Sequence, residues 1–225
     1  MTETGNLPIR YRLPRRLTQL YLGLVAYGAS MALMVRSRVG NMPWDVFHQG
    51  LARHTGLSFG TLTILVGALA LLAWIPLRQR PGIGTLSNVV VIGLVADGTL
   101  AVVPAPRLMS ARIGLLALGV LLNGLASGLY IGAGLGPGPG DGLMTGLAAR
   151  TGLSIRLVRT GLEVAVVLSG WLLGGTVGAG TVVYAVTIGP LVQLFLPRLT
   201  VRRPVPVPAP ADPPAALTDP APAAP

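Results

Sequence analysis

The chain has 225 residues, of which 52% are hydrophobic and 11% are charged, and its mean hydropathy is +0.68. Because an average soluble domain has about 25% charged residues, this composition excludes a water-soluble globule and indicates a protein of the lipid bilayer. The net charge of +10 does not indicate a nucleic-acid-binding protein, because the arginines lie singly or in small groups at the ends of hydrophobic segments. The absence of cysteine excludes disulfides and cysteine metal sites.

Six hydrophobic segments approach the length of about 20 residues that a membrane-spanning helix needs. A basic segment, residues 1–16, precedes the first of them, and we expect the chain to be all-α. After the last segment, residues 204–225 are largely proline and alanine, which predicts a disordered, polyproline-like tail. The expected spans are Leu17–Val35, Phe59–Leu77, Thr85–Val103, Ile113–Ile131, Ile155–Gly174 and Thr181–Leu196.

The two halves of the chain share a sequence repeat at a constant offset of 96 residues. A Pro-x-Asp motif at residues 43–45 returns at 139–141, and a Thr-Gly-Leu-Ser segment at 55–58 returns at 151–154. Because both motifs recur in one register without a gap, shared composition does not explain them. We therefore predict two membrane repeats, over residues 17–104 and 111–199.

Each repeat also contains a predicted short helix, Pro43–His54 and Pro139–Arg150. Proline suits the first helical position, and glycine suits the position after the helix, here Gly56 and Gly152. Twelve residues rise only about 18 Å, too little to cross a hydrocarbon core of about 30 Å. The short helices are therefore expected to be interfacial or re-entrant.

Three spans per half make the second repeat enter the bilayer from the opposite side, as in many secondary transporters. If the short helices did cross, the repeats would instead be parallel. With a cytoplasmic N-terminus, twelve arginines fall inside and five outside for six spans, and thirteen and four for eight. Because both counts fit, the length of the short helices decides for six spans. We predict inverted repeats and two cytoplasmic termini.

Three glycine- and proline-rich stretches carry a family resemblance: Asn41-Met-Pro-Trp-Asp45, Gly134-Leu-Gly-Pro-Gly-Pro-Gly-Asp-Gly142 and Gly178-Ala-Gly-Thr181. In these motifs the chain resembles the bacterial YczE/YitT-type integral membrane proteins, over roughly residues 15–200. The resemblance implies a multi-pass protein of the bacterial inner membrane and brings no biochemical activity with it. The family pattern often has arginine just before the second aspartate, where this chain has Gly140.

Five ionisable residues are candidates for binding a solute or ion. Asp45 and Asp141 each open a short helix, where they either cap the helix or form a site. Glu163 lies deep in the fifth expected span, and Arg159, four residues earlier, is spaced for an ion pair that is either structural or functional. Asp97 lies in the third span, where it either joins such a site or reaches the interface.

Glycines at four-residue spacing predict close helix packing, within the chain or in a homo-oligomer: Gly124, Gly128 and Gly132 in one helix, and Gly170 and Gly174 in another. Trp74 and Trp171, late in their spans, are typical of interfacial anchors.

The leading functional hypothesis is secondary transport of a small solute or ion, which rests on architecture. The alternative is a non-transporting membrane scaffold or accessory protein. We predict no enzyme activity, because no nucleophile and base are paired, and no cofactor or metal site. The expected partners are the lipid bilayer and a small solute or ion, with a homo-oligomer as a further alternative and no nucleic acid.

Overall fold

The computed structural model describes residues 11–201, which form eight α-helices and, within this range, no β-strand. The all-helical prediction is thus confirmed. The predicted disordered tail at 204–225 and residues 1–10 of the basic N-terminal segment lie outside the described residues. The helices are α1 (Leu13–Ser37), α2 (Pro43–Thr55), α3 (Phe59–Leu77), α4 (Ile83–Val102), α5 (Met109–Gly132), α6 (Pro139–Thr151), α7 (Ile155–Leu172) and α8 (Ala179–Leu199).

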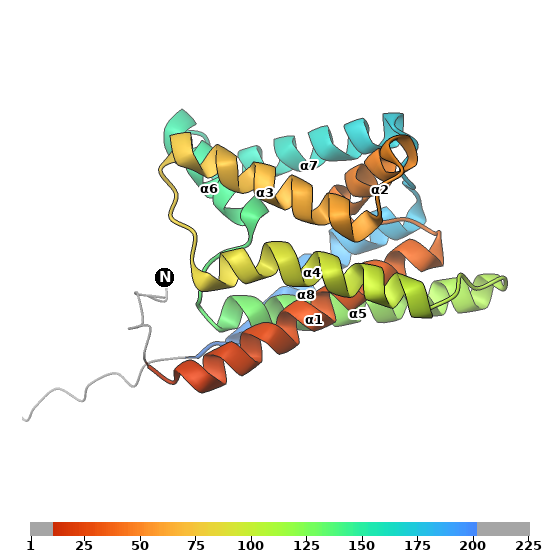
Figure 1. The fold of residues 1–225 in the computed structure, drawn as a ribbon, viewed down its shortest axis with the longest axis horizontal. Coiled ribbons are helices and arrows are strands. Elements are labelled where there is room, and N and C mark those ends of the chain that lie inside the picture. The colour runs from red at the N-terminus through yellow and green to blue at the C-terminus, as the bar shows by residue number, and fades with distance from the viewer. Residues whose placement is uncertain (1–10, 202–225) are drawn as a thin grey trace, which may run out of the picture.

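Five of these helices, α1, α3, α4, α5 and α8, are long and apolar enough to cross a membrane. The sixth expected span, α7, has 18 residues, which rise about 27 Å, but it carries Arg156, Arg159 and Glu163. These charges explain why its composition alone does not mark it as a span. In Figure 1, α7 runs along the same axis as the other long helices.

The helices are arranged in two layers (Figure 1). In one layer, α1 packs against α5 and α4, and α5 packs against α8. In the other layer, α2 and α6 each contact both α3 and α7, so the two short helices bridge the two long ones. The packing of α3 along α4 joins the layers on one side.

The direction of the chain shows that neither short helix crosses the bundle (Figure 1). Helices α1, α4 and α7 run from left to right in this view, and α3, α5 and α8 return. Because α1 ends and α3 begins at the same end, α2 enters and leaves there; α6 does so at the opposite end. The described chain begins and ends at one end of the bundle.

Local signals in the sequence set the boundaries of the short helices as predicted. Pro43 and Pro139 are their first residues, and Gly56 and Gly152 follow them with φ of 69° and 71°. This left-handed conformation costs glycine little and stops the helix.

The two halves interlock at the start of α4 and α8. The Gly84 N–H donates to the Leu135 carbonyl at 2.9 Å, and the corresponding Gly180 N–H donates to the Val39 carbonyl at 3.1 Å. Gly136 has a φ of +130°, and a Cβ there would lie 2.6 Å from Thr85 Oγ1. Only glycine therefore allows this close approach.

Four of the five predicted packing glycines do allow helices to approach closely. A Cβ added to the α5 glycines would meet α8 atoms, and one added at Gly170 would lie 2.5 Å from the Phe47 nitrogen of α2. On α5, the added Cβ would lie 2.7 Å from Leu191 at Gly124, 3.0 Å from Phe195 at Gly128 and 2.6 Å from Leu199 at Gly132. These glycine faces are therefore occupied inside the chain.

The fifth glycine and one tryptophan have other roles than predicted. Gly174 lies beyond the end of α7 with a φ of 84°, so it contributes a turn rather than a helix face. Trp74 is only 2% exposed and donates its indole N–H to the Pro139 carbonyl at 3.0 Å. It is an internal contact between α3 and α6, and not an interfacial anchor.

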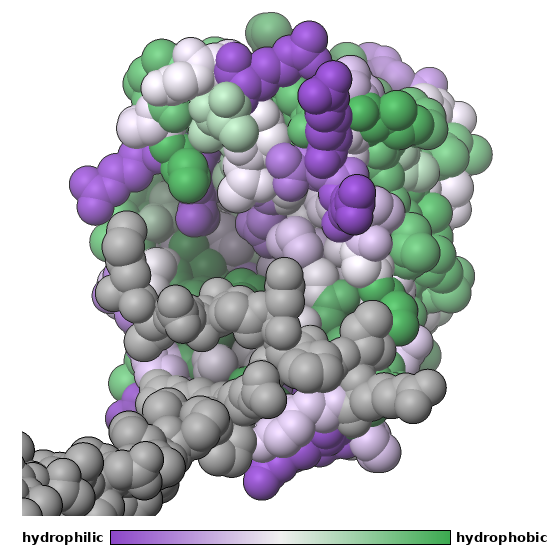
Figure 2. All heavy atoms as spheres, turned by 90° about the vertical axis from the view of Figure 1, so that its left-hand side faces the viewer, coloured by the Kyte–Doolittle hydropathy of each residue, from purple (hydrophilic) through white to green (hydrophobic). Residues whose placement is uncertain are grey.

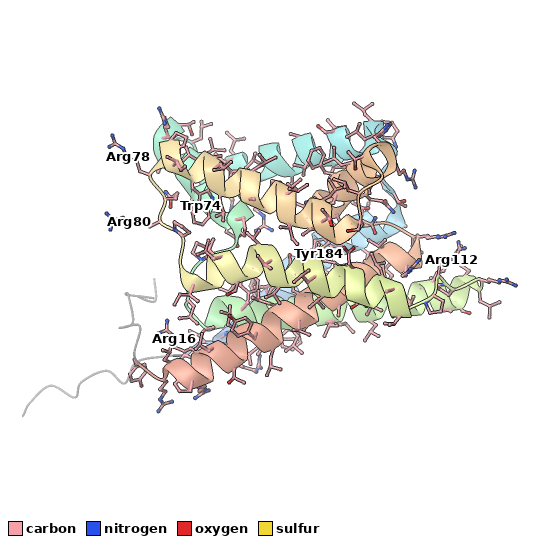
Figure 3. All side chains as sticks on the ribbon, viewed as in Figure 1. Arg16, Trp74, Arg78, Arg80, Arg112 and Tyr184 are labelled. Carbon is pink, nitrogen blue, oxygen red and sulfur yellow. The ribbon has the colours of Figure 1, made fainter. Side chains whose placement is uncertain are left out.

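The outer surface separates apolar sides from polar ends. Figure 2 looks at the end where α1 begins, and hydrophobic side chains cover the right flank of this view while hydrophilic ones gather on the end face. Arg78 and Arg80 extend from this end, and Arg112 from the opposite one (Figure 3). This is the distribution expected for a bundle whose sides face lipid.

Candidate binding cavity between the two layers

A cavity of about 200 Å³ lies between the layers, and each helix of the described segment contributes to its wall. The first turns of α2 and α6 bring Asp45 and Asp141 to it from equivalent positions in the two halves. Arg159 and Glu163 line it from α7, and Tyr184 from α8 lies between the layers (Figure 3). Four of the five predicted ionisable candidates thus meet at one cavity.

Asp45 is buried without a full set of partners. Its side chain is 1% exposed, and Oδ1 lies 3.5 Å from His48 Nδ1. Oδ2 has no hydrogen-bond partner within residues 11–201. Burial raises the pKa of the Asp45 carboxyl, and His48 opposes this effect. Since no side-chain hydrogen bond caps α2, capping does not account for this aspartate.

Asp141, unlike Asp45, has hydrogen-bond donors for the carboxylate oxygen Oδ2. Its Oδ2 accepts a hydrogen bond from the Tyr130 hydroxyl at 3.1 Å and from the Gly138 N–H at 3.3 Å. Burial raises the pKa of the Asp141 carboxyl, and these two hydrogen bonds oppose it. Asp141 therefore caps α6 and also lines the cavity, so both predicted alternatives apply to it.

Aromatic side chains form much of the remaining wall. The rings of Tyr27 and Tyr130 meet edge to face at 5.9 Å. The Tyr184 hydroxyl donates to Asn123 Oδ1 at 3.1 Å, and Asn123 Nδ2 donates to Ser30 Oγ at 2.9 Å. These bonds hold α8, α5 and α1 together behind the cavity and fix the Tyr184 side chain in place.

The predicted ion pair on α7 is present. Arg159 Nε lies 2.8 Å from Glu163 Oε1, but the side chains are 57% and 32% exposed in the chain. The pair is therefore not buried in the protein core, and it lies at the rim of the cavity instead. Its two charges largely cancel each other there.

Asp97 is the candidate that the structure does not bring to the cavity. Its Oδ1 accepts the Gly60 N–H at 2.7 Å, and Oδ2 accepts a hydrogen bond from the Ser58 hydroxyl. Asp97, near the end of α4, thus caps the start of α3 and holds these helices together.

Sequence reasoning missed the three tyrosines and the buried Arg16. Tyr27, Tyr130 and Tyr184 lie within apolar spans, where polar side chains are costly and point to function. Arg16, which the sequence places in the basic segment 1–16, is buried and donates to the carbonyls of Ala133 and Gly134 at 2.7 Å. It binds the end of α5.

Fold and cavity together define a polytopic helical membrane protein with a cavity lined by acidic, aromatic and aliphatic side chains. Residues 14–197 match DUF6198, a family of unknown function, and the chain belongs to this family. It is 35% identical over 193 residues to the uncharacterized membrane protein YczE of Bacillus subtilis, covering 84% of this chain and 89% of that protein. The predicted YczE-type resemblance is thus confirmed.

A second relative, an uncharacterized protein of Haemophilus influenzae, is 41% identical over 177 residues, covering 79% of this chain and 81% of that protein. No solved structure matches the chain.

Proposed function

We propose that this protein is a secondary transporter or permease of a small solute or ion in the bacterial inner membrane. The observation that carries the proposal is Asp45: a buried carboxylate with an unpartnered oxygen, lining a cavity to which both halves of the chain contribute. Buried polar atoms are normally hydrogen-bonded, and an ionisable group with an unsatisfied oxygen at a cavity is a candidate for ligand binding.

The relation between the halves supports the proposal. Helices α1 and α5 start the two sequence repeats, and they run in opposite directions (Figure 1). We infer inverted repeats, an architecture in which transporters bind substrate near the bilayer midplane at the repeat interface. The first turns of the short helices α2 and α6 both line the cavity, which is consistent with such a site.

Unequal packing of equivalent helices suggests how access alternates. Helix α3 packs along α4, whereas the corresponding pair, α7 and α8, makes almost no contact. Exchanging the two arrangements would close α7 on α8 and separate α3 from α4. In inverted repeats, this exchange opens the cavity to the other side of the membrane.

Uptake by vesicles tests the proposal. Purified protein is reconstituted into liposomes, which are incubated with an equimolar mixture of small cationic, anionic and neutral solutes under a proton gradient. Mass spectrometry of the washed vesicles measures their contents. We expect protein-dependent accumulation of one class of solute, lost in the Asp45→Asn variant; contents equal to those of protein-free vesicles would contradict transport.

The scaffold hypothesis has less support. The glycine faces do not support it, because Gly124, Gly128, Gly132 and Gly170 all pack against helices of the same chain.

A further inference from the structure

We propose that the cavity binds a small organic cation, an amine or a quaternary ammonium ion, whose charge lies against Asp45. The inference rests on the proposed function for the biological role of the cavity, and it adds the class of substrate. It follows from the charge of the wall, from its chemistry and from the volume.

The described wall carries an excess of negative charge. Asp45 and Asp141 contribute carboxylates, while the third acid, Glu163, is paired with Arg159. Residue 140, next to Asp141, is glycine and adds no charge. Among the buried carboxylate oxygens of residues 11–201, only Asp45 Oδ2 lacks a hydrogen-bond partner, so it offers the contact point for a cationic group.

The wall is not suited to a bare metal ion. Sodium, magnesium and calcium ions need several oxygen ligands at once, usually six or more for calcium and magnesium. No group of three or more His, Cys, Asp or Glu side chains in the described part of the chain is arranged to hold a metal. A cavity of about 200 Å³ also exceeds a water's share of about 30 Å³ several times.

The wall does suit an organic cation. Tyr27, Tyr130, Tyr184 and Trp44 line it together with methionine and aliphatic side chains. Aromatic rings attract cations electrostatically, and aromatic cages are the usual way to bind quaternary ammonium groups. The aliphatic part of the same ligand would lie against the apolar wall.

An anion is the alternative that helix geometry alone would suggest. The first turns of α2 and α6 both lie at the cavity, and helix N-termini attract anions. However, each first turn already contains an aspartate, and the Asp141 carboxylate accepts the Gly138 N–H. A bound anion would therefore meet two carboxylates.

Calorimetric titration of the purified full-length protein in detergent tests the inference without requiring transport. The probes are choline and 3,3-dimethyl-1-butanol, which has the same shape with a neutral carbon in place of the ammonium nitrogen. We expect choline to bind about 10- to 100-fold more tightly than the alcohol, the range for hydrogen bonds and charge contacts to a buried ionised group. Acetate should not bind.

Two variants locate the site. Asp45→Asn should weaken choline binding by about 10-fold or more, whereas Asp141→Asn should have a smaller effect because Asp141 already has two partners. Equal affinity for choline and the alcohol, or choline affinity unaffected by Asp45→Asn, would overturn the inference. So would tighter binding of sodium than of choline.

The outcomes separate this inference from the transport proposal. If choline binds through Asp45 but vesicles accumulate no solute, the cation site stands and transport falls. If vesicles accumulate an anion or a neutral solute and choline does not bind, transport stands and the cation site is wrong.

Discussion

The two equivalent aspartates have diverged in a way that matters for stability. Asp141 has a hydroxyl and a backbone N–H as donors, whereas one oxygen of Asp45 has no donor among the described residues although the side chain is 1% exposed. An unsatisfied buried polar group costs about 1–3 kcal/mol, and more if it is charged. Asp45 therefore reduces stability, as functional residues often do.

We predict that Asp45→Asn does not lower the free energy of unfolding and raises it by up to about 1 kcal/mol, because the variant removes a buried charge. The matched change Asp97→Asn should instead lower it by about 1–2 kcal/mol, since this carboxylate accepts two hydrogen bonds. Unfolding in detergent, followed by circular dichroism, measures both. A loss at Asp45 as large as that at Asp97 would show that Asp45 has a structural role.

The difference in free energy of unfolding between Asp45→Asn and the wild type should also depend on pH. Burial raises the pKa of its carboxyl above the ordinary value, so the folded protein binds this proton more tightly than the unfolded chain. Wild-type stability is then lost as pH rises through the raised pKa, and the Asn variant lacks this loss. The advantage of Asp45→Asn should therefore be larger at pH 8 than at pH 4.

Single residues were predictable to the extent that their partners lie close in sequence. Arg159 and Glu163 are one helical turn apart, so their spacing predicted the pair. Asp97 contacts Ser58 and Gly60, 39 and 37 residues away, and no local pattern announces such contacts. The same limit applies to Trp74, whose acceptor at Pro139 lies in the other half of the chain.

Among elements, the short helices were the easiest to predict and the packing between helices the hardest. Proline and glycine fix the ends of α2 and α6 through local backbone geometry, and Asp141 caps the start of α6. The sequence repeat implies equal packing in both halves, yet α3 and α4 are in contact while α7 and α8 are almost separate. A repeat cannot reveal which of two packing states a given half adopts.

Cysteine pairs test whether both states exist, and the chain offers a clean background because it has no cysteine. Ser58→Cys with Asp97→Cys joins α3 to α4 where the native side chains are hydrogen-bonded. The equivalent pair, Ser154→Cys with Gln193→Cys, joins α7 to α8. In vesicles under oxidising conditions, we expect the first pair to cross-link in high yield and the second in lower yield.

A maleimide–polyethylene glycol reagent modifies only cysteines that have not cross-linked, and the modified protein is shifted on a gel. The unshifted fraction therefore measures the cross-linking yield. A second pair that never cross-links, while the first does so fully, would indicate one fixed state and contradict alternating access.

At the scale of the whole molecule, the described chain begins and ends at the same end of the bundle (Figure 1). That end also carries the loop with Arg78 and Arg80, whereas Arg112 lies at the other (Figure 3). The sequence predicted this division because the hydrophobic runs are easy to count and α2 and α6 are too short to cross. Which of the two ends faces the cytoplasm depends on the charge bias of the loops.

We predict that both termini are cytoplasmic. With six helices crossing, twelve arginines lie on the side of the termini and five on the other, and positively charged loops are retained in the cytoplasm during insertion. Alkaline phosphatase fused after Leu217 should be inactive and green fluorescent protein at the same position should fluoresce.

The control is a fusion within the 104–108 loop, between α4 and α5, where the two reporters should behave oppositely. Active phosphatase after Leu217 would mean that α7 does not cross or that the whole bundle is inverted, and the loop fusion separates these cases: an inverted bundle makes the loop cytoplasmic, whereas a non-crossing α7 leaves it periplasmic.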